Sequence, residues 1–196
     1  VIWPETSIQK KGYFRESRLD FEPNFQMVKR FLRKHPDVVL VAGISSWDTV
    51  NINQPHVVNP YFREDIGYYK KYNASIIASI DTTVLYHKSK LVPGVEKTPF
   101  PRVMKVIVDI INFDGSGDFG VSAGPVIYEN KDGEAIAPTI CYESIYGEHV
   151  AEFVRKGADY IAIIRPVSFF IRHNPASRLC CDQNQNLRCR LNNPRC

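Results

Sequence analysis

The chain is poor in cysteine over most of its length. Only one of its five cysteines, Cys141, lies before residue 180, and the other four lie in the segment 180–196. None of them forms a C-x-x-C pair, although His173 lies nearby, and this absence argues against the usual zinc patterns. We therefore expect no metal centre and no cofactor, and Cys141 stands alone as a candidate thiol.

Long hydrophobic runs are also missing. No apolar stretch approaches the roughly 18 residues that indicate a membrane-spanning helix. The chain begins at Val1 without an initiator methionine or a signal-like region. Its 196 residues are 44% hydrophobic and 23% charged, which is typical of one globular domain with a substantial core. We expect a segment of a longer protein, whose membrane spans would lie outside this chain.

Lysine and acidic residues are almost absent from the segment 165–196. It holds six arginines and a single acid, Asp182, so its net charge is +5, and the chain total of +4 leaves −1 for residues 1–164. A nucleic-acid-binding function would rest on that tail alone, and we expect no nucleic-acid partner. Gly115–Gly120 fits G-x-G-x-x-G but leads into a strand-like stretch, so a dinucleotide site is not expected.

Hydrophobic spacing predicts a mixed α/β domain in which strands alternate with helices and hairpins. A helix is expected from Pro23 to His35, where apolar residues recur at helical spacing. Residues 48–72 are polar and aromatic and predict a long surface excursion. The other expected elements are strands at Val1–Trp3, Val38–Ile44, Ala74–Ile80, Thr83–Tyr86, Ala123–Tyr128, Ala135–Cys141 and Asp159–Ile164, and helices at Gly147–Lys156 and Arg102–Phe113.

Cys141 lies within Thr139-Ile140-Cys141-Tyr142-Glu143-Ser144, directly after an apolar run typical of a strand. A lone cysteine at such a place is most often a small buried hydrophobic residue. A strand that turns into a helix here would instead expose the thiol and direct backbone N–H groups toward it. Those groups favour a thiolate and stabilise a developing oxyanion. The abrupt change from Ala135–Ile140 to Tyr-Glu-Ser favours this second interpretation.

Two further polar residues follow strand-like segments far upstream. Glu5 comes after an apolar stretch and a proline, where a carboxylate is often a helix cap or a solvated loop residue. Lys88 lies in a strand-like pattern in which Tyr86, Lys88 and Lys90 would share one face. Two amines on one face fit either a charged edge strand or a group that stabilises an anion.

Three segments carry a family resemblance together. They are Trp3-Pro4-Glu5-Thr6, Tyr86-x-Lys88-x-x-Leu91-Val92-Pro93-x-x-Glu96 and Cys141-Tyr142-Glu143, in this order. In this combination they resemble the nitrilase (carbon–nitrogen hydrolase) superfamily, and within it most closely the bacterial apolipoprotein N-acyltransferases. The Leu-Val-Pro segment with Glu96 is what separates the acyltransferases from ordinary amidases. The resemblance covers residues 1–164.

The resemblance implies a nitrilase-like αββα sandwich with a Glu-Lys-Cys triad. Matched to the family motifs, Glu5 is the general base, Lys88 stabilises the tetrahedral intermediate and Cys141 is the nucleophile. Lys90 is the rival of Lys88, but the Tyr-x-Lys frame favours Lys88. The supporting positions that match the acyltransferases are Glu96, Tyr142 and Glu143.

The resemblance also implies a reaction and a location. A fatty acyl group would pass from a phospholipid to the N-terminal cysteine amine of a diacylglyceryl-apolipoprotein, through a thioester on Cys141. Such enzymes are inner-membrane proteins whose catalytic domain faces the periplasm, and the membrane segments are missing here. The alternative is a soluble carbon–nitrogen hydrolase, an amidase or nitrilase, that uses the same triad with water as acceptor.

Residues 165–196 depart from the family pattern. After Ala162-Ile163-Ile164 the family continues with Thr-Asn-Asp, whereas this chain continues with Arg165-Pro166-Val167. A divergent terminus is one explanation, but we favour a reading-frame error, because Cys180–Gln185 shifted by one base can read Ala-Ala-Ile-Arg-Thr-Arg, close to an expected helix. The catalytic domain would then be partial, residues 1–164, and the chain an incomplete and inactive sandwich. Resequencing the gene across this junction tests the hypothesis, and an intact frame would refute it.

Overall fold

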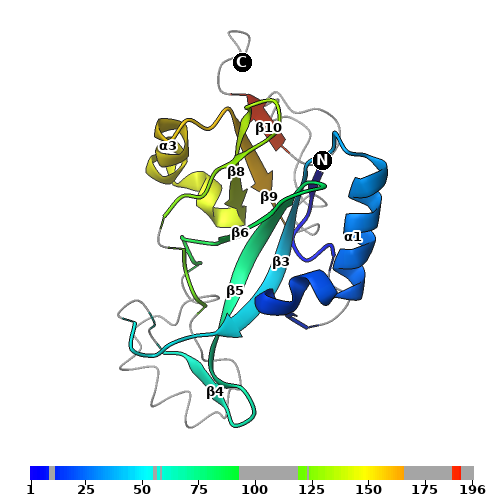
Figure 1. Ribbon diagram of the computed structural model, residues 1–196. Helices are drawn as coiled ribbons and strands as arrows, with labels where there is room; N and C mark the ends of the chain where they lie inside the picture. The colour runs from blue at the N-terminus through cyan, green and yellow to red at the C-terminus, as the bar shows by residue number, and fades with distance from the viewer. Residues whose placement is uncertain are drawn as a thin grey trace, which may run out of the picture.

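The computed structural model describes residues 1–8, 12–54, 57, 59–92, 119–122, 124–165 and 187–190 (Figure 1). The strands are β1 (Ile2–Trp3), β2 (Phe14–Arg15), β3 (Leu40–Thr49), β4 (Tyr61–Arg63), β5 (Gly67–Ala78), β6 (Thr83–His87), β7 (Tyr128–Glu129), β8 (Ala135–Ile140), β9 (Tyr160–Ile164) and β10 (Leu187–Arg190). The helices are α1 (Pro23–Lys34) and α3 (Gly147–Arg155), with 3₁₀ segments η1 (Glu16–Phe21) and η2 (Cys141–Ile145).

The first sheet is built on the long antiparallel pair of β3 and β5. Its register runs from Leu40 opposite Ala78 to Thr49 opposite Tyr69. Strands β1 and β2 pair with β3 in parallel, and β4 and β6 pair with β5 in antiparallel orientation. Because β1 pairs with Val41 and Ala42, the residues that follow it lie beside Gly43, within β3.

The second sheet has the strand order β10, β9, β8, β7. Strands β8 and β9 are parallel, and Ile140 at the end of β8 lies opposite Ile164 at the end of β9. The hairpin between β7 and β8 turns at Asn130, whose Oδ1 accepts the backbone N–H groups of Asp132 and Glu134. Such side-chain-to-backbone bonds are typical of Asn in turns, and they confirm the hairpin predicted from the sequence.

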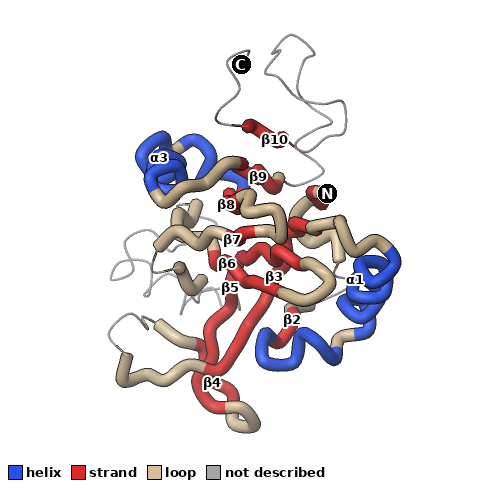
Figure 2. The backbone as a smooth tube through the Cα atoms, turned by 45° about the horizontal axis from the view of Figure 1, so that its top comes forward, coloured by secondary structure: helices blue, strands red, loops and turns tan. Residues whose placement is uncertain are grey.

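The two faces of the first sheet enter different hydrophobic cores. One face, which includes Val41, packs against residues of the second sheet such as Ile161. The other face, which includes Ala42, packs against Leu32 of α1. Figures 1 and 2 place α1 and α3 on opposite sides of the two sheets, and α3 adds Phe153 to the core between the sheets. The fold is mixed α/β with the layering of a nitrilase-like αββα sandwich.

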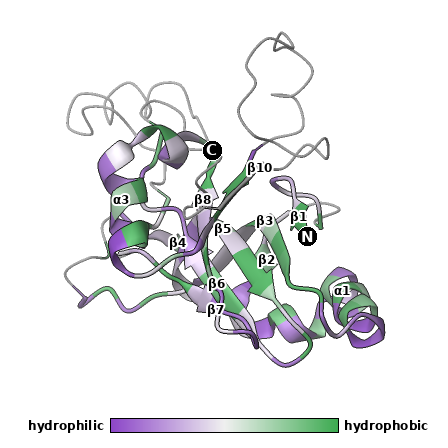
Figure 3. Cartoon of the chain, turned by 90° about the horizontal axis from the view of Figure 1, so that it is seen from above, coloured by the Kyte–Doolittle hydropathy of each residue, from purple (hydrophilic) through white to green (hydrophobic). Residues whose placement is uncertain are grey.

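The amphipathic pattern of α1 explains how it covers the first sheet. Phe25, Val28 and Leu32 are buried at helical spacing, while hydrophobic and hydrophilic residues alternate along the helix (Figure 3). Pro23 at the first helical turn and Pro36 after the end fix its limits. None of the helices that the structure describes has the length and hydropathy required to cross a lipid bilayer.

Most of the expected elements are confirmed with shifted ends, but the strand expected at Ala123–Tyr128 is wrong, because β7 spans only Tyr128–Glu129 and residues 124–127 are not in a strand. The surface excursion expected over residues 48–72 is wrong, because β4 lies within it and β5 begins at Gly67. Tyrosine-rich strands form there because aromatic residues pack well across paired strands, as Tyr69 does against Trp47 and Tyr61. The helix expected at Arg102–Phe113 lies outside the described residues.

Candidate active site

Cys141 lies at the point where β8 ends and η2 begins. Its φ of 48° is in the left-handed region, which non-glycine residues enter at a cost of about 1–2 kcal/mol. The carbonyl of Cys141 accepts a hydrogen bond of 2.8 Å from Ser144 Oγ, which closes the turn. The sharp change of direction leaves Cys141 only partly buried, although the preceding Ile140 is fully buried.

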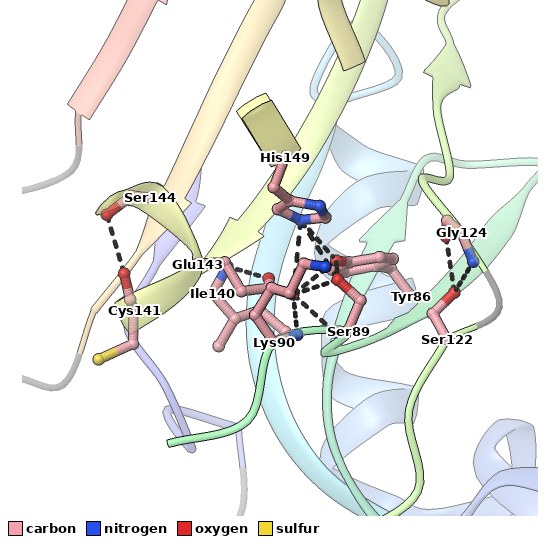
Figure 4. Close-up of polar contacts among 10 residues, drawn as sticks. All are labelled: Tyr86, Ser89, Lys90, Ser122, Gly124, Ile140, Cys141, Glu143, Ser144 and His149. Atoms are coloured by element: carbon pink, nitrogen blue, oxygen red, sulfur yellow. Dashed lines mark hydrogen bonds and ion pairs between the residues drawn. The ribbon is translucent and has the colours of Figure 1, made fainter. Parts of the chain in front are cut away.

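Glu143 is fully buried, and its carboxylate is the centre of a hydrogen-bonded cluster (Figure 4). The donors to its Oε1 atom are Tyr86 OH at 2.7 Å, Ser89 N–H at 2.6 Å, Ser89 Oγ–H at 2.9 Å and Lys90 N–H at 3.2 Å. Its Oε2 atom accepts the Ile140 N–H at 2.8 Å. A buried carboxylate needs such donors to offset its lost hydration. Glu143 therefore ties the segment that follows β6 to the turn that follows β8.

Tyr86 keeps its proton inside this cluster. Burial, followed by the negative charge of Glu143, raises the pKa of Tyr86 well above its ordinary value. The phenol is therefore neutral at physiological pH and is able to donate to the Glu143 carboxylate. Tyr86 belongs to the core between the two sheets, so the face of β6 that carries it is the face toward the second sheet.

Lys88 follows β6 and continues its pairing with β5, since the Lys88 N–H donates to Asn73 O at 2.8 Å. By strand alternation Lys88 shares the face of Tyr86, and its side chain is only 1% exposed. Lys90, by contrast, is exposed. The sequence placed Lys90 on the same strand face as Tyr86 and Lys88, but β6 ends at His87, and Lys90 lies outside the core.

Glu5 lies just after β1, beside Gly43 within β3 and beside Arg165, the residue that follows β9. The Pro4 carbonyl accepts the Gly43 N–H of β3 at 3.3 Å, and the Glu5 N–H donates to the Arg165 carbonyl after β9 at 3.3 Å. A Cβ atom on Gly43 would lie 2.6 Å from Glu5 Cα and 3.0 Å from Ile164 Cγ2. Only glycine at position 43 allows the backbone of Glu5 to approach β3 so closely.

Arg165 links the Glu5 segment to the Cys141 turn. Because β8 and β9 are parallel with Ile140 opposite Ile164, Arg165 follows β9 at the level where Cys141 follows β8. The Arg165 carbonyl accepts the Glu5 N–H, and its Nη2 atom lies 3.4 Å from Ser144 Oγ in the turn. The segments of the three predicted triad residues thus converge through contacts made by Glu143 and Arg165.

The predicted supporting residues have different outcomes. Glu143 is the centre of the cluster described above, and Glu96 lies outside the described residues. Tyr142 is partly buried, and its ring lies edge-on to that of Tyr146 with the centroids 5.3 Å apart. Among the residues that the structure describes, no three His, Cys, Asp or Glu side chains are grouped so that they would hold a metal ion.

Sequence reasoning missed four residues that shape the site, namely Gly43, Ser89, His149 and Arg165. Ser89 contacts Glu143, 54 residues away in the sequence, and Arg165 contacts Ser144, 21 residues away. No local sequence pattern reveals such contacts. His149 carries a weak signal, because it lies four residues before Phe153 on the buried side of α3. Gly43 interrupts an otherwise apolar strand, which often indicates a close backbone approach.

Chemically, the arrangement offers a thiol on a strained turn, a buried amine and a carboxylate on neighbouring segments. A thiol next to a base is a nucleophile for carbonyl carbon. Backbone N–H groups at the start of a helical turn and an ammonium group are suitable donors for the oxyanion that forms. These groups are the kinds that covalent acyl chemistry uses.

The chain is similar in sequence to known proteins of one family. The family model of the carbon–nitrogen hydrolases matches residues 1–177. An apolipoprotein N-acyltransferase of Chlorobaculum tepidum is 26% identical, over 98% of this chain and 37% of its own length. An enzyme of the same name from Vibrio vulnificus is 33% identical, over 48% of this chain and 18% of its own length. The chain thus spans well under half the length of these relatives.

Solved structures of low identity are similar as well. An amidase of Nesterenkonia sp. AN1 has a TM-score of 0.47 at 13% identity, over 84% of this chain and 52% of its own. A glutamine-dependent NAD⁺ synthetase of Acinetobacter baumannii has a TM-score of 0.45 at 18% identity, over 84% of this chain and 25% of its own. The family model covers most of the chain, and on that match this protein belongs to the carbon–nitrogen hydrolase family.

Proposed function

We propose that this chain is the catalytic part of an N-acyltransferase that modifies bacterial lipoproteins. The acyl donor is a phospholipid, and the acceptor is the α-amine of the N-terminal diacylglyceryl-cysteine of an apolipoprotein. The names of the relatives from Chlorobaculum tepidum and Vibrio vulnificus support this choice within the family. We place the enzyme in the inner membrane with this domain facing the periplasm, attached through segments outside the chain.

One observation carries the proposal most strongly. The buried carboxylate of Glu143 holds the backbone N–H groups on both sides of the candidate site, those of Ser89 and Lys90 and that of Ile140. Lys88 precedes the first pair and Cys141 follows the last. We infer that the role of Glu143 is to set Lys88 against Cys141, as an acyl-transfer site requires.

In the first half-reaction the Sγ atom of Cys141 attacks the ester carbonyl carbon of the phospholipid. Glu5 takes the thiol proton, and Lys88 with the backbone N–H of Tyr142 stabilises the tetrahedral oxyanion. The carbon–oxygen bond to glycerol then breaks, and Glu5 returns the proton to the leaving alkoxide. The products are a lysophospholipid and an acyl thioester on Cys141.

In the second half-reaction the lipoprotein amine attacks the thioester carbonyl carbon. Glu5 takes a proton from the amine, the carbon–sulfur bond breaks, and the proton passes to the thiolate of Cys141. An amide forms and the enzyme returns to its starting state. Splitting the transfer into two steps lets a single site use two large lipid substrates in turn.

The competing assignment is a hydrolase that uses the same first step with an amide and water. The family match alone is equally consistent with both reactions. The acceptor separates them. The hydrolase transfers the acyl group to water and releases ammonia from an amide, whereas the acyltransferase increases the mass of an amine substrate by one acyl group.

The test is mass spectrometry of the Cys141 peptide after the full-length protein has been incubated with phospholipid. We expect an acyl adduct that hydroxylamine removes, that is absent in Cys141→Ser and that persists in the matched tail variant Cys180→Ser. A diacylglyceryl-cysteine peptide should then discharge the adduct and gain its mass. An unmodified Cys141, or release of ammonia from simple amides with no transfer to the peptide, would overturn the proposal.

A further inference from the structure

His149 of α3 lies against the Glu143 cluster, and the proposed mechanism assigns it no role. It is only 3% exposed, and its Nε2 atom lies 3.2 Å from Tyr86 OH, 3.4 Å from Ser89 Oγ and 3.6 Å from Glu143 Oε1. Its ring also packs edge-on against Phe153, with the centroids 5.0 Å apart. Figure 4 shows the imidazole pointing toward these oxygen atoms. Because Nε2 lies near three oxygen atoms, the hydrogen bonds of this cluster depend on whether Nε2 donates or accepts.

The oxygen neighbours decide whether Nε2 donates or accepts. If Nε2 were an acceptor, a hydroxyl proton of Tyr86 or Ser89 would have to leave Glu143 and turn toward the imidazole. The Nε2 lone pair would then also face the carboxylate at 3.6 Å, which is repulsive. If Nε2 carries a proton, it donates to Tyr86 OH while Tyr86 donates to Glu143, and neither hydroxyl has to leave the carboxylate.

We propose that His149 is a positioning residue whose Nε2–H directs the Tyr86 hydroxyl toward Glu143. The resulting relay runs from His149 through Tyr86 to the carboxylate that holds the Ser89 and Lys90 N–H groups. Its effect on the reaction, which rests on the proposed function, is to fix the position of the preceding Lys88 for oxyanion stabilisation.

The surroundings leave this donor role intact over a wide pH range. The polar and charged groups that contact the His149 ring in the described part of the chain are Tyr86 of β6, Ser89 after it and Glu143 of η2. Neutral imidazole with the proton on Nε2 and the imidazolium ion both donate at that atom. Gln is the substitution that best retains a donor near the Nε2 position, whereas Phe fills the space without one.

The first experiment is a long-range ¹H–¹⁵N correlation spectrum of the full chain with ¹⁵N-labelled histidine. The His149 signals are assigned by their loss in His149→Gln. We expect a proton on Nε2 throughout pH 6–9. A neutral ring with its proton on Nδ1 instead would overturn the proposal, whatever reaction the protein catalyses.

The second experiment compares two reactions of Cys141. Thioester formation with a p-nitrophenyl acyl ester passes through an oxyanion, whereas alkylation by iodoacetamide does not. Loss of one positioning hydrogen bond should slow acylation about tenfold in His149→Phe, with little change in alkylation. His149→Gln should recover most of the acylation rate, and the surface control His35→Phe should behave as the unsubstituted protein.

The outcomes separate this inference from the proposed function. If the unsubstituted protein forms no thioester, the proposed function fails, and the tautomer still decides the donor role. If the thioester forms equally fast in His149→Phe, only the positioning role fails. Equal slowing of acylation and alkylation would show a general loss of structure and would also refute the positioning role. Should His149→Phe not fold, a slow acylation rate in His149→Gln despite a native circular dichroism spectrum would count against the relay.

Discussion

Replacing Gly43 by alanine tests whether the placement of Glu5 matters to the site. Gly43 lies on β3, and the loop that carries Glu5 crosses directly over it with a hydrogen bond from the Gly43 N–H to the Pro4 carbonyl. The added methyl carbon would lie 2.6 Å from Glu5 Cα, 3.2 Å from Glu5 Cγ and 3.0 Å from Ile164 Cγ2. One of these contacts is with backbone, which is unable to rotate away as a side chain would.

The size of the effect follows from these distances. Carbon atoms in contact are ordinarily about 3.5–4.0 Å apart, so the Glu5 backbone has to move by about 1 Å. Overpacking of this kind costs about 1–3 kcal/mol of folding free energy. A catalytic group displaced by about 1 Å loses on the order of 100-fold in rate. We therefore expect Gly43→Ala to slow Cys141 acylation about 100-fold, which corresponds to about 2.7 kcal/mol of activation free energy, in a protein that stays folded after a loss of about 1–3 kcal/mol of stability.

The assay pairs urea unfolding with the rate of thioester formation on Cys141. Gly147→Ala is the matched control, because it adds the same carbon where no atom lies within 4 Å. We expect this control to retain both the stability and the rate of the unsubstituted protein. A Gly43→Ala variant that is folded and acylates at the normal rate would refute the close approach, or the role of Glu5, or both.

Three further predictions concern the cluster, the turn and the first sheet. Glu143→Gln places an amide N–H₂ against N–H donors, so we expect a loss of about 2 kcal/mol in urea unfolding, and an unchanged stability would contradict the cluster. At position 141, whose φ is 48°, Cys141→Gly should be more stable than Cys141→Ala by about 1 kcal/mol, the reverse of the usual order, and the usual order would disprove the strain. Burial and then the charges of Glu16 and Asp48 raise the pKa of Tyr72 to about 12 from 10.0. The neutral phenol stabilises the fold below pH 10, and this contribution is lost as the pH rises from 10 to 12, so Tyr72→Phe should fall less in its urea midpoint over that range than the unsubstituted protein. An equally steep fall in both proteins would show that Tyr72 does not titrate in this way.

Local patterns predicted the elements that depend on neighbouring residues. The helix α1 follows from the spacing of its buried Phe25, Val28 and Leu32 and from Pro36 after its end. The same spacing includes Phe31, yet this side chain is 39% exposed, because α1 presents a narrower buried face than the pattern suggests. Periodicity gives the type of an element more reliably than the partner of each side chain.

The extended part of the first sheet was not predicted, because its strands are tyrosine- and lysine-rich and only partly buried. In this region Tyr69 pairs with Thr49 of β3 on one side and Tyr61 of β4 on the other. Lys71 lies 4.4 Å from the centre of the Tyr61 ring, so a charged residue is stabilised within the strand. Aromatic and cationic side chains that cover each other form a strand without the apolar alternation on which the prediction relied.

The candidate site was predictable as a set of motifs and not as a geometry. Glu5, Lys88 and Cys141 were identified in their motifs, and their proposed catalytic roles stay predictions. The boundary at residue 164 likewise stays a prediction. What the sequence could not supply is the link between the motifs, since Glu143 and Tyr86 meet across 57 positions.

The wide spacing of the candidate residues has a structural reason. A carboxylate, an amine and a thiol on one short segment would share its fluctuations, whereas here each follows a different strand, β1, β6 or β8. The strand ends are held by paired sheets, and the two links between them, through Glu143 and Arg165, are made largely to backbone atoms. Backbone contacts fix a segment while leaving its side chain available for chemistry. Loss of the Glu143 link, or of the close approach of Glu5 to Gly43, should therefore disturb the site even when all three candidate catalytic residues are present. Glu143 and Gly43, rather than the triad alone, are for this reason the decisive positions for testing it.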